Sequence, residues 1–253
     1  MNIQNRSERV RFAVFTSHAL PYIDRSVENW LQPDELRVAA GAFATGCLVE
    51  GKVSVSMRSR IEKVFHLAEA SNLPSILEHG LMSTKRLLGL ARIPEADHAG
   101  RLRSHRPESE HLSSSVLIRD QKPMPPSALE QALEDGLTPG DWYALLNDFV
   151  FFWLDEGRME RQRLACGDRP QVLLTFDAPA LLERFGTDAF VSPINSGNAR
   201  RKPARRGLST LMPYDTWLAN GWPSGTRYRP PAELLFRGTI PVQPPYLIEM
   251  REM

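Results

Sequence analysis

The stretch KVFHLAEASNLPSILEHGL, residues 63–81, carries the clearest structural signals of the chain. Its first six residues alternate in polarity, as a short β-strand does. Asn72 then stands at an N-cap position, with Pro74 in the first turn of the helix after it. Gly80 supplies the residue that lets a helix end in the left-handed conformation. The stretch therefore predicts a strand that leads directly into a helix.

Short strands and short helices alternate after this stretch, without a regular strand–helix–strand rhythm. DFVFFW (148–153), QVLLTFD (171–177) and AELLFRGTI (232–240) have the composition of strands. A helix capped by Thr138 precedes the first of these strands, and a charged helix over 156–166 comes after it. This arrangement predicts an α+β protein rather than a doubly wound parallel sheet.

Two segments lack any such pattern. Residues 92–115 are polar and basic, which predicts a mobile loop, and the Pro- and Gly-rich stretch 200–231 is expected to be irregular. Residues 1–56 also differ in character from the remainder of the chain. They are either a small N-terminal extension packed on the main domain, with one or two short helices and a strand, or a tail from an upstream start codon. We expect residues 57–253 to form the main domain.

The composition excludes several classes of protein. The chain has 253 residues, of which 42% are hydrophobic, enough for a real core. It shows no apolar run long enough to span a bilayer and no secretory signal, so the cytoplasm is the default compartment. Cys47 and Cys166 lie too far apart for a Cys-x-x-Cys site. Without GxGxxG or Walker motifs, Rossmann and P-loop nucleotide binding are not expected.

The formal net charge of +1 conceals local concentrations of positive charge. Residues 98–111 hold three Arg and three His, whose spacing does not predict a metal site. Residues 200–206 read RRKPARR and hold five cations: Arg200, Arg201, Lys202, Arg205 and Arg206. Both segments are either solvated loops or surfaces that attract a polyanion, such as a nucleic acid or a pyrophosphate.

Two residues stand out because each places a polar group in an apolar strand. If Phe65 and Leu67 face a core, His66 faces a cleft or solvent on the other side. Glu233 opens the apolar run ELLF, where a carboxylate rarely lies without a partner. They are either a half-buried histidine and a strand-edge glutamate, or parts of a cleft. In a cleft, His66 and Asn72 would bind a phosphate or ribose, and Glu233 would stabilise positive charge or act as a base.

Three further polar segments are candidates for ligand binding. Arg119 either forms a salt bridge with Asp120 that locks a turn, or binds a ligand. Arg158 comes after the aromatic strand, where a strand-to-helix turn can hold an anion. SPINSGNA (192–199) is a loop of small polar residues, which either approaches a ligand by its backbone or forms an ordinary turn.

Several of these segments together resemble known families. FHLAEASNLPSILEHGLMST resembles the opening of the DarT-like ADP-ribosyltransferases, in which a His-containing strand leads into an NL-x-x-I-x-x-x-GL helix. VFFW and PAELLFRG resemble that family's aromatic strand and its strand with the catalytic glutamate. The chain is also similar to a bacterial family of unknown function through RDQKPM, DWYALLNDFVFFW and SPINSG. This second resemblance covers roughly residues 61–242.

The resemblance implies an ADP-ribosyltransferase-like fold, with a split mixed or antiparallel sheet and short flanking helices. It implies that NAD is the substrate, that Glu233 is the catalytic carboxylate, and that His66 acts with it. His66 and Asn72 would hold the nicotinamide ribose and carboxamide in a reactive pose. Those transferases carry an Arg directly after the aromatic strand. Here VFFWLDEGR places Arg158 later, so Arg158 and Arg119 compete for the role of neutralising the pyrophosphate.

The implied chemistry breaks the nicotinamide–ribose bond through an oxocarbenium-like centre, as in glycoside cleavage. The basic segments 98–111 and 200–206 favour a nucleic-acid base as acceptor, in single-stranded DNA or RNA. A role as a toxin or phage-defence enzyme, with an antitoxin or regulatory partner, goes with this hypothesis. Two alternatives stay open. One is a non-catalytic nucleotide- or nucleic-acid-binding domain of the same fold, and the other is a related enzyme that removes a phosphate from RNA using NAD and needs no glutamate.

Overall fold

The strand and helix expected at the start of the domain are present. The computed structural model describes residues 61–113, 116–200, 202–223 and 229–253. Strand β1 (Lys63–Glu69) runs through a 3-10 turn, η2 (Ala70–Asn72), into helix α2 (Leu73–His79), which Gly80 ends. The expected extension at residues 1–56 lies outside the described residues.

The described strands form a seven-stranded sheet in which every pair is antiparallel. In spatial order the strands are β11 (Leu247–Glu252), β6 (Gln171–Asp177), β1, β5 (Phe149–Trp153), β9 (Glu233–Arg237), β7 (Ala189–Ser192) and β8 (Met212–Pro213). Two small ribbons add β2 (Leu81–Met82) with β10 (Thr239–Ile240) and β3 (Glu110–Ser113) with β4 (Val116–Ile118). The α+β class expected from the sequence is confirmed.

The sheet divides between β1 and β5. Strand β1 pairs with β6 over its whole length, and β5 pairs with β9 over its whole length. By contrast, β1 and β5 pair only at Phe65 and Trp153. The two strands diverge beyond that pair, which leaves a gap in the hydrogen-bond ladder at the centre of the sheet.

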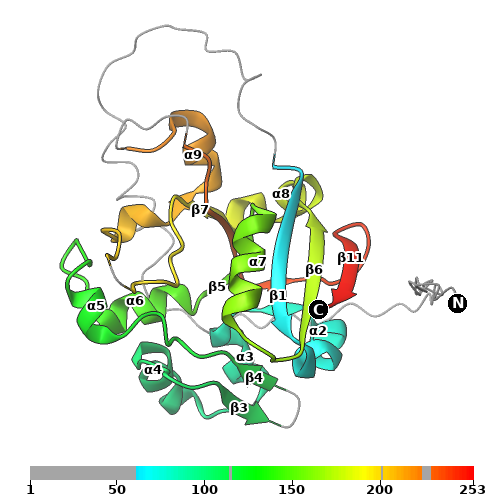
Figure 1. Cartoon of the computed structure of the whole chain (residues 1–253), viewed down its shortest axis with the longest axis horizontal. Coiled ribbons are helices and arrows are strands. Elements are labelled where there is room, and N and C mark those ends of the chain that lie inside the picture. Colours follow the sequence, from blue (N-terminus) through cyan, green and yellow to red (C-terminus); the bar gives the residue numbers. More distant parts are fainter. Residues whose placement is uncertain (1–60, 114–115, 201, 224–228) are drawn as a thin grey trace, which may run out of the picture.

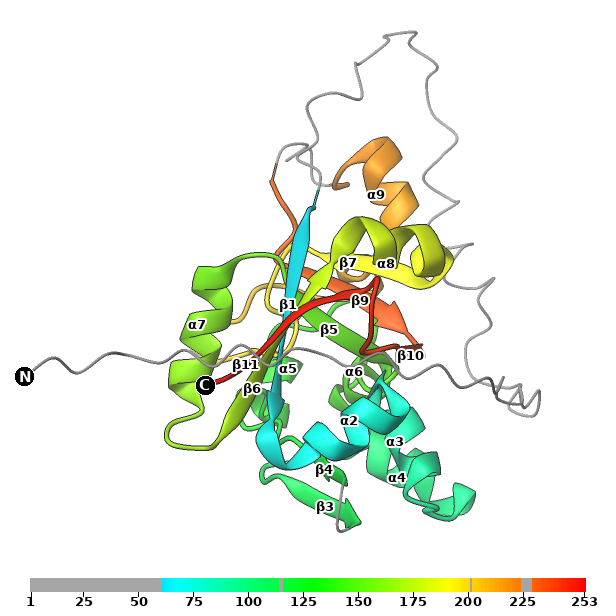
Figure 2. The ribbon, with the colours of Figure 1, turned by 90° about the vertical axis from the view of Figure 1, so that its right-hand side faces the viewer.

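Helices cover both faces of the sheet (Figures 1 and 2). Helices α2, α8 (Ala178–Phe185) and α9 (Tyr214–Asn220) pack on one face through Ile76, Leu181 and Trp217. On the other face α7 (Glu156–Ala165) lies over β1 and β6, while α5 (Pro126–Glu130) and α6 (Pro139–Leu146) lie over β5, β9 and β7. Two separate hydrophobic clusters therefore share this second face. None of the described helices is long and apolar enough to cross a membrane.

The expectation of a mobile loop over residues 92–115 is wrong. Helix α3 (Thr84–Leu90) is followed by α4 (Glu95–Arg103), and β3 comes after it. Helix α4 buries none of its residues, so it has no apolar stripe to find in the sequence. Its charges do fit a helix, since Glu95 lies in the first turn and Arg103 in the last.

The stretch before β9 is also more regular than expected. It contains a 3-10 turn η4 (Leu208–Thr210), strand β8 and helix α9. A further 3-10 turn, η3 (Gly186–Asp188), precedes β7. Helix α5 is short and ends at Glu130. Helix α6 has the Thr138 cap that the sequence predicts, with Asp141 completing a capping box.

Gly80 is required by both its backbone conformation and its surroundings. Its φ is +83°, and a Cβ added there would lie 2.6 Å from the carbonyl oxygen of Ile240.

Gly80→Ala is expected to lower the free energy of unfolding by about 2 kcal/mol or more. Gly89→Ala, in exposed helix α3 with open space around it, is expected to raise it by about 0.5–1 kcal/mol. Urea unfolding of both variants checks this, and equal effects would contradict it.

Candidate functional site

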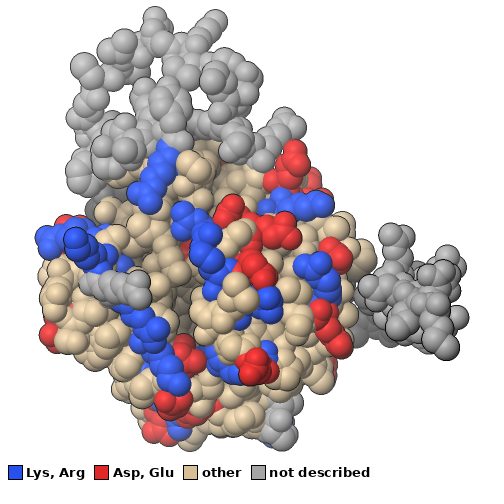
Figure 3. Space-filling view, in the orientation of Figure 1, with Lys and Arg blue, Asp and Glu red and all other residues tan. Residues whose placement is uncertain are grey.

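A cleft of about 920 Å³ opens where β1 and β5 diverge, a volume typical of small-molecule sites. Its walls come from these two strands, hairpin β3–β4 with the segment after it, the end of α7 and loop 195–200. Figure 3 shows blue and red side chains intermixed over this face of the molecule. The cations that line the cleft are Arg106, Arg119, Lys122, Arg169 and Arg200.

Two side chains take up backbone groups that the divided sheet leaves without strand partners. Continuing the register would place Leu67 opposite Phe151, where β1 and β5 no longer pair. The Phe151 carbonyl instead accepts a hydrogen bond from Nδ1 of His66 at 2.8 Å. The Leu67 carbonyl accepts one from Arg119 Nη1 at 3.3 Å. Since a buried carbonyl needs a partner, His66 and Arg119 hold the cleft open as well as lining it.

His66 faces the cleft, as the sequence predicts. Phe65 and Leu67 pack beneath α7, and His66 is half-buried with its ring against Phe152. Burial lowers the pKa of His66 to about 4, a change that the bond to Phe151 opposes and the charge of Arg119 assists. The ring is therefore neutral at pH 7. Because a carbonyl only accepts, Nδ1 carries the proton and Nε2 is an acceptor.

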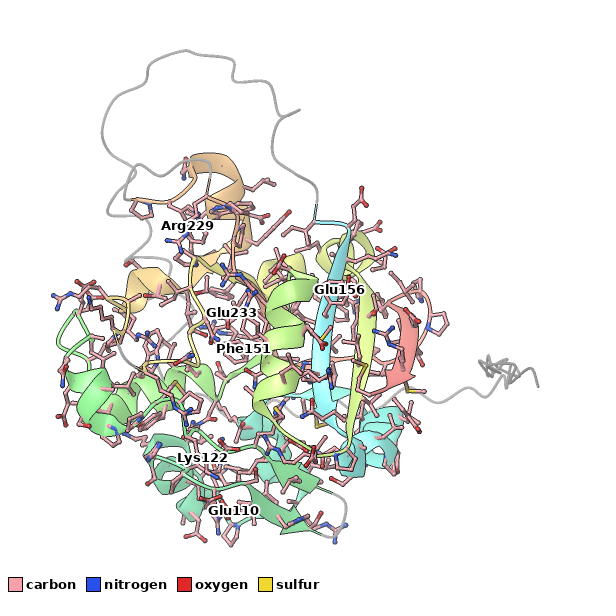
Figure 4. The ribbon with its side chains drawn as sticks, in the orientation of Figure 1. Glu110, Lys122, Phe151, Glu156, Arg229 and Glu233 are labelled. Carbon is pink, nitrogen blue, oxygen red and sulfur yellow. The ribbon has the colours of Figure 1, made fainter. Side chains whose placement is uncertain are left out.

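Glu233 is the first residue of β9 and lies only 4% exposed at the bottom of the cleft. It sits between Trp153 of β5 and Ser192 of β7 in the sheet. Its Oε2 atom accepts hydrogen bonds from the backbone N–H of Ser196 at 3.1 Å and from the Ser196 hydroxyl at 2.7 Å. Oε1 accepts no hydrogen bond from the described residues. Figure 4 shows Glu233 near Phe151 at the centre of the molecule.

The carboxyl group of Glu233 titrates near neutrality. Burial raises its pKa to about 7, against the stabilising effects of Ser196 and of the positive charges of Arg158 and Arg206. A displaced pKa of this kind in a cleft is typical of functional carboxylates. Of the two alternatives for Glu233, the structure shows a buried carboxylate in a cleft rather than one exposed at a strand edge.

Asn72 occupies the N-cap position of α2, but its side chain makes no capping hydrogen bond. Its amide instead clamps β4, donating from Nδ2 to the Leu117 carbonyl at 2.7 Å and accepting from the Leu117 N–H at 2.8 Å. The expectation that Asn72 caps the helix through its side chain is therefore wrong. The residue lines the cleft, but its amide first serves to fix hairpin β3–β4 against β1.

Arg119 belongs to a buried ionic cluster that the sequence does not indicate. Its Nε atom lies 3.1 Å from Oε1 of Glu69, and its Nη2 atom contacts the Cys166 thiol. Arg169 lies 3.3 Å from the same Glu69 oxygen and 3.4 Å from Asp120. The interpretation of Arg119 and Asp120 as a salt bridge is thus wrong, since each pairs with a different residue. Glu69 and Arg169 lie 100 positions apart, so no local spacing relates them.

Arg158 lies in the first turn of α7, half-buried, with its backbone N–H bonded to the side chain of Asp155 at 2.8 Å. Its positive charge acts on Glu233, but Arg158 is not among the residues that line the cleft. The structure thus places Arg158 nearer the carboxylate and Arg119 nearer β1.

The basic run at 200–206 is not a uniform exposed surface. Arg200 and Lys202 are exposed, Arg201 lies outside the described residues, and Arg205 pairs with Glu134 at 2.9 Å. Arg206 is 1% exposed and donates to the carbonyls of Ser196, Asn198 and Ala204. The expectation that Arg206 binds an acceptor at the surface is wrong, because its guanidinium is committed inside the fold. The sequence missed Arg106, Lys122 and Arg169 as cleft residues.

The fold and cleft define an α+β protein with a divided antiparallel sheet and a buried carboxylate on β9, the strand paired with β5. The model of a family of unknown function (DUF7002) matches residues 62–247, and the chain belongs to this family. The match includes β1, β5, β9 and loop 195–200, so it covers all walls of the cleft. No curated protein matches the chain.

The raised pKa of Glu233 makes the stability of the protein depend on pH. Between the ordinary Glu value near 4.5 and about 7, the folded state binds more protons than the unfolded state, so stability falls as pH rises. Glu233→Gln removes this dependence. Relative to wild type, the variant should gain up to about 3 kcal/mol between pH 4.5 and pH 7.5. Urea unfolding of both proteins across this range measures it, and a constant difference would contradict the titration assigned to Glu233.

Proposed function

We propose that this protein is an NAD-dependent ADP-ribosyltransferase with Glu233 as its catalytic carboxylate. The observation that carries the proposal is Glu233 itself, a buried carboxyl group that lines the cleft with Oε2 bonded to Ser196 and Oε1 without a hydrogen bond from the described residues, and whose pKa burial raises to about 7. It shares that cleft with neutral His66 and with several arginines. A carboxylate, a neutral imidazole and cations in one small-molecule cleft fit a substrate that carries riboses and a pyrophosphate.

The reaction would break the glycosidic bond between ribose C1′ and nicotinamide, which leaves with the bonding electron pair. A new bond would form from C1′ to a nucleophilic atom of the acceptor, whose proton must be removed. Oε1 of Glu233 can take that proton, because a base with a pKa of about 7 is about half ionised at neutral pH. The same carboxylate stabilises the positive charge that develops on the sugar.

The other cleft residues would bind and orient NAD. Nε2 of His66 can accept a hydrogen bond from a ribose hydroxyl, since Nδ1–H is already engaged. Asn72 would act through the position of β4, because its amide is bonded to Leu117. Arg119 and Arg158 remain the two candidates for the pyrophosphate. Arg119 lines the cleft but is paired with Glu69, whereas Arg158 acts on Glu233 by its charge without lining the cleft, so both stay candidates.

A nucleic-acid base is the acceptor that the cleft mouth favours. Arg200 lines the cleft and can contact phosphates, and Lys122, which lines it too (Figure 4), can do so on leaving its ion pair with Glu108. Half-buried Phe151 and Trp153 present aromatic faces in the same cleft, and a base released from its strand can stack on such faces.

The test is nicotinamide release from NAD, measured with and without mixed single-stranded DNA and RNA. Glu233→Gln is expected to lower the rate by about 10²- to 10⁴-fold, the usual contribution of a catalytic acid–base group. Glu183→Gln, an exposed glutamate of α8, is the matched control and should keep the wild-type rate. The polymer that stimulates release identifies the acceptor class.

Three outcomes would overturn the proposal. A Glu233→Gln variant with the wild-type rate would remove Glu233 from the chemistry. NAD binding without nicotinamide release under any condition would indicate a non-catalytic binding domain. Removal of a phosphate from RNA that depends on His66 and Arg119 but not on Glu233 would indicate the related phosphate-removing reaction.

A further inference from the structure

The carboxylate of Glu233 is held by a two-step network of buried groups. Ser196, which is fully buried, donates both its backbone N–H and its hydroxyl to Oε2 of Glu233. Arg206, 1% exposed, donates from Nη1 to the Ser196 carbonyl at 3.1 Å and from Nη2 to the Asn198 carbonyl at 2.9 Å. The network therefore runs from Arg206 through the loop to Ser196 and then to the carboxylate.

The position of Arg206 is itself well determined. Its Nε atom donates to the Ala204 carbonyl at 3.0 Å, and its guanidinium lies 5.9 Å from the ring centre of Trp142 in α6. Its backbone N–H donates to Ala132, and its carbonyl accepts from Glu134. Burying a guanidinium costs free energy, which the hydrogen bonds to three carbonyl oxygens offset only in a fixed geometry. All three carbonyls lie within residues 196–204. Arg206 therefore fixes the conformation of the segment that contains Ser196, which is bonded to Glu233.

We infer that Ser196 is a positioning residue that fixes Glu233 with Oε2 engaged and Oε1 alone directed at the substrate, and that Arg206 acts through it. This inference rests on the proposed function of Glu233 and adds which residues fix the orientation of its carboxylate. Ser196 is neither a nucleophile nor a base here, since its hydroxyl proton is donated to Oε2. A carboxylate with one oxygen immobilised keeps a single orientation relative to the sugar, which favours reaction in one geometry.

A network of this kind also controls the ionisation of Glu233. The hydrogen bonds from Ser196 favour the charged carboxylate and oppose the effect of burial on its pKa. Hydrogen bonds to a charged group are stronger than those to a neutral one, so loss of the Ser196 hydroxyl removes part of this stabilisation of the carboxylate. Ser196→Ala should therefore raise the pKa of Glu233 by about one pH unit.

The experiment monitors the carboxyl titration directly, by infrared difference spectroscopy of wild type and Ser196→Ala, with Glu233→Gln to identify the band. We expect the band to titrate at higher pH in Ser196→Ala and at the wild-type pH in Ser196→Thr, which keeps the hydroxyl. Ser209→Ala, on the exposed turn η4, is the matched control and should leave the titration unchanged. Thermal unfolding of each variant checks that it is folded.

Nicotinamide release gives the second measurement. In Ser196→Ala, kcat at pH 7 should fall about fivefold with an unchanged KM for NAD, because a pKa one unit higher leaves that much less of the base ionised. The acidic limb of the pH profile, where the rate rises as Glu233 loses its proton, should move upward with the titration. A merely structural defect would lower the rate without moving that limb. Arg206→Lys keeps the charge but cannot serve both carbonyls, so it should shift the titration in the same direction.

Different results would overturn the positioning role of Ser196 and the proposed transferase function. A carboxyl band at the wild-type pH in both Ser196→Ala and Arg206→Lys would overturn the positioning role, whatever the rate of release. A shifted band in a protein that releases no nicotinamide would overturn the proposed function. Ser196 would still be the residue that fixes the orientation and the pKa of Glu233.

Discussion

The separation of β1 from β5 after a single residue pair is the constraint on which the rest of the structure depends. Two strands in the middle of a sheet normally satisfy each other's backbone groups, and here they do not. The vacated positions are filled by the His66 imidazole and the Arg119 guanidinium. The cleft is therefore made by the same side chains that line it.

The way the cleft is built also determines the charge states of the groups that line it. Because His66 supplies a proton to a backbone carbonyl and is largely withdrawn from water, it stays neutral. Glu69 is enclosed between two arginines, whereas Glu233 faces the cleft with serine donors as its nearest partners. The two buried glutamates, Glu69 and Glu233, therefore have different roles. One is part of an ionic cluster that anchors hairpin β3–β4, and the other is poised to change its charge near pH 7.

Local patterns in the sequence predicted several of the elements that build the cleft, but not strand β3, which lies in the segment expected to be a loop. The strand and helix around His66 are signalled by alternation, a cap position and glycine, whereas β5 and β9 are signalled by their apolar runs. A polar helix such as α4 could not be predicted, because it has no buried face to leave a hydrophobic period. Nor could the pairing of Glu69 with Arg119 and Arg169, because the sequence holds many arginines and tertiary folding selects among them.

The run RRKPARR illustrates how tertiary structure separates residues that look alike in sequence. Arg205 and Arg206 are neighbours with the same chemistry, yet one forms an ion pair at the surface and the other lies inside the fold beneath loop 195–200. A count of cations in the run overstates the charge that it offers to a polyanion, since among its described residues only Arg200 and Lys202 are both exposed and outside ion pairs. Attraction of a nucleic acid to this site would depend on these two together with Lys122 and on aromatic stacking within the cleft, rather than on charge density alone. The buried member of the run acts instead on the carboxylate, because two of the three carbonyls that its guanidinium bonds, those of Ser196 and Asn198, belong to loop 195–200, which fixes Glu233.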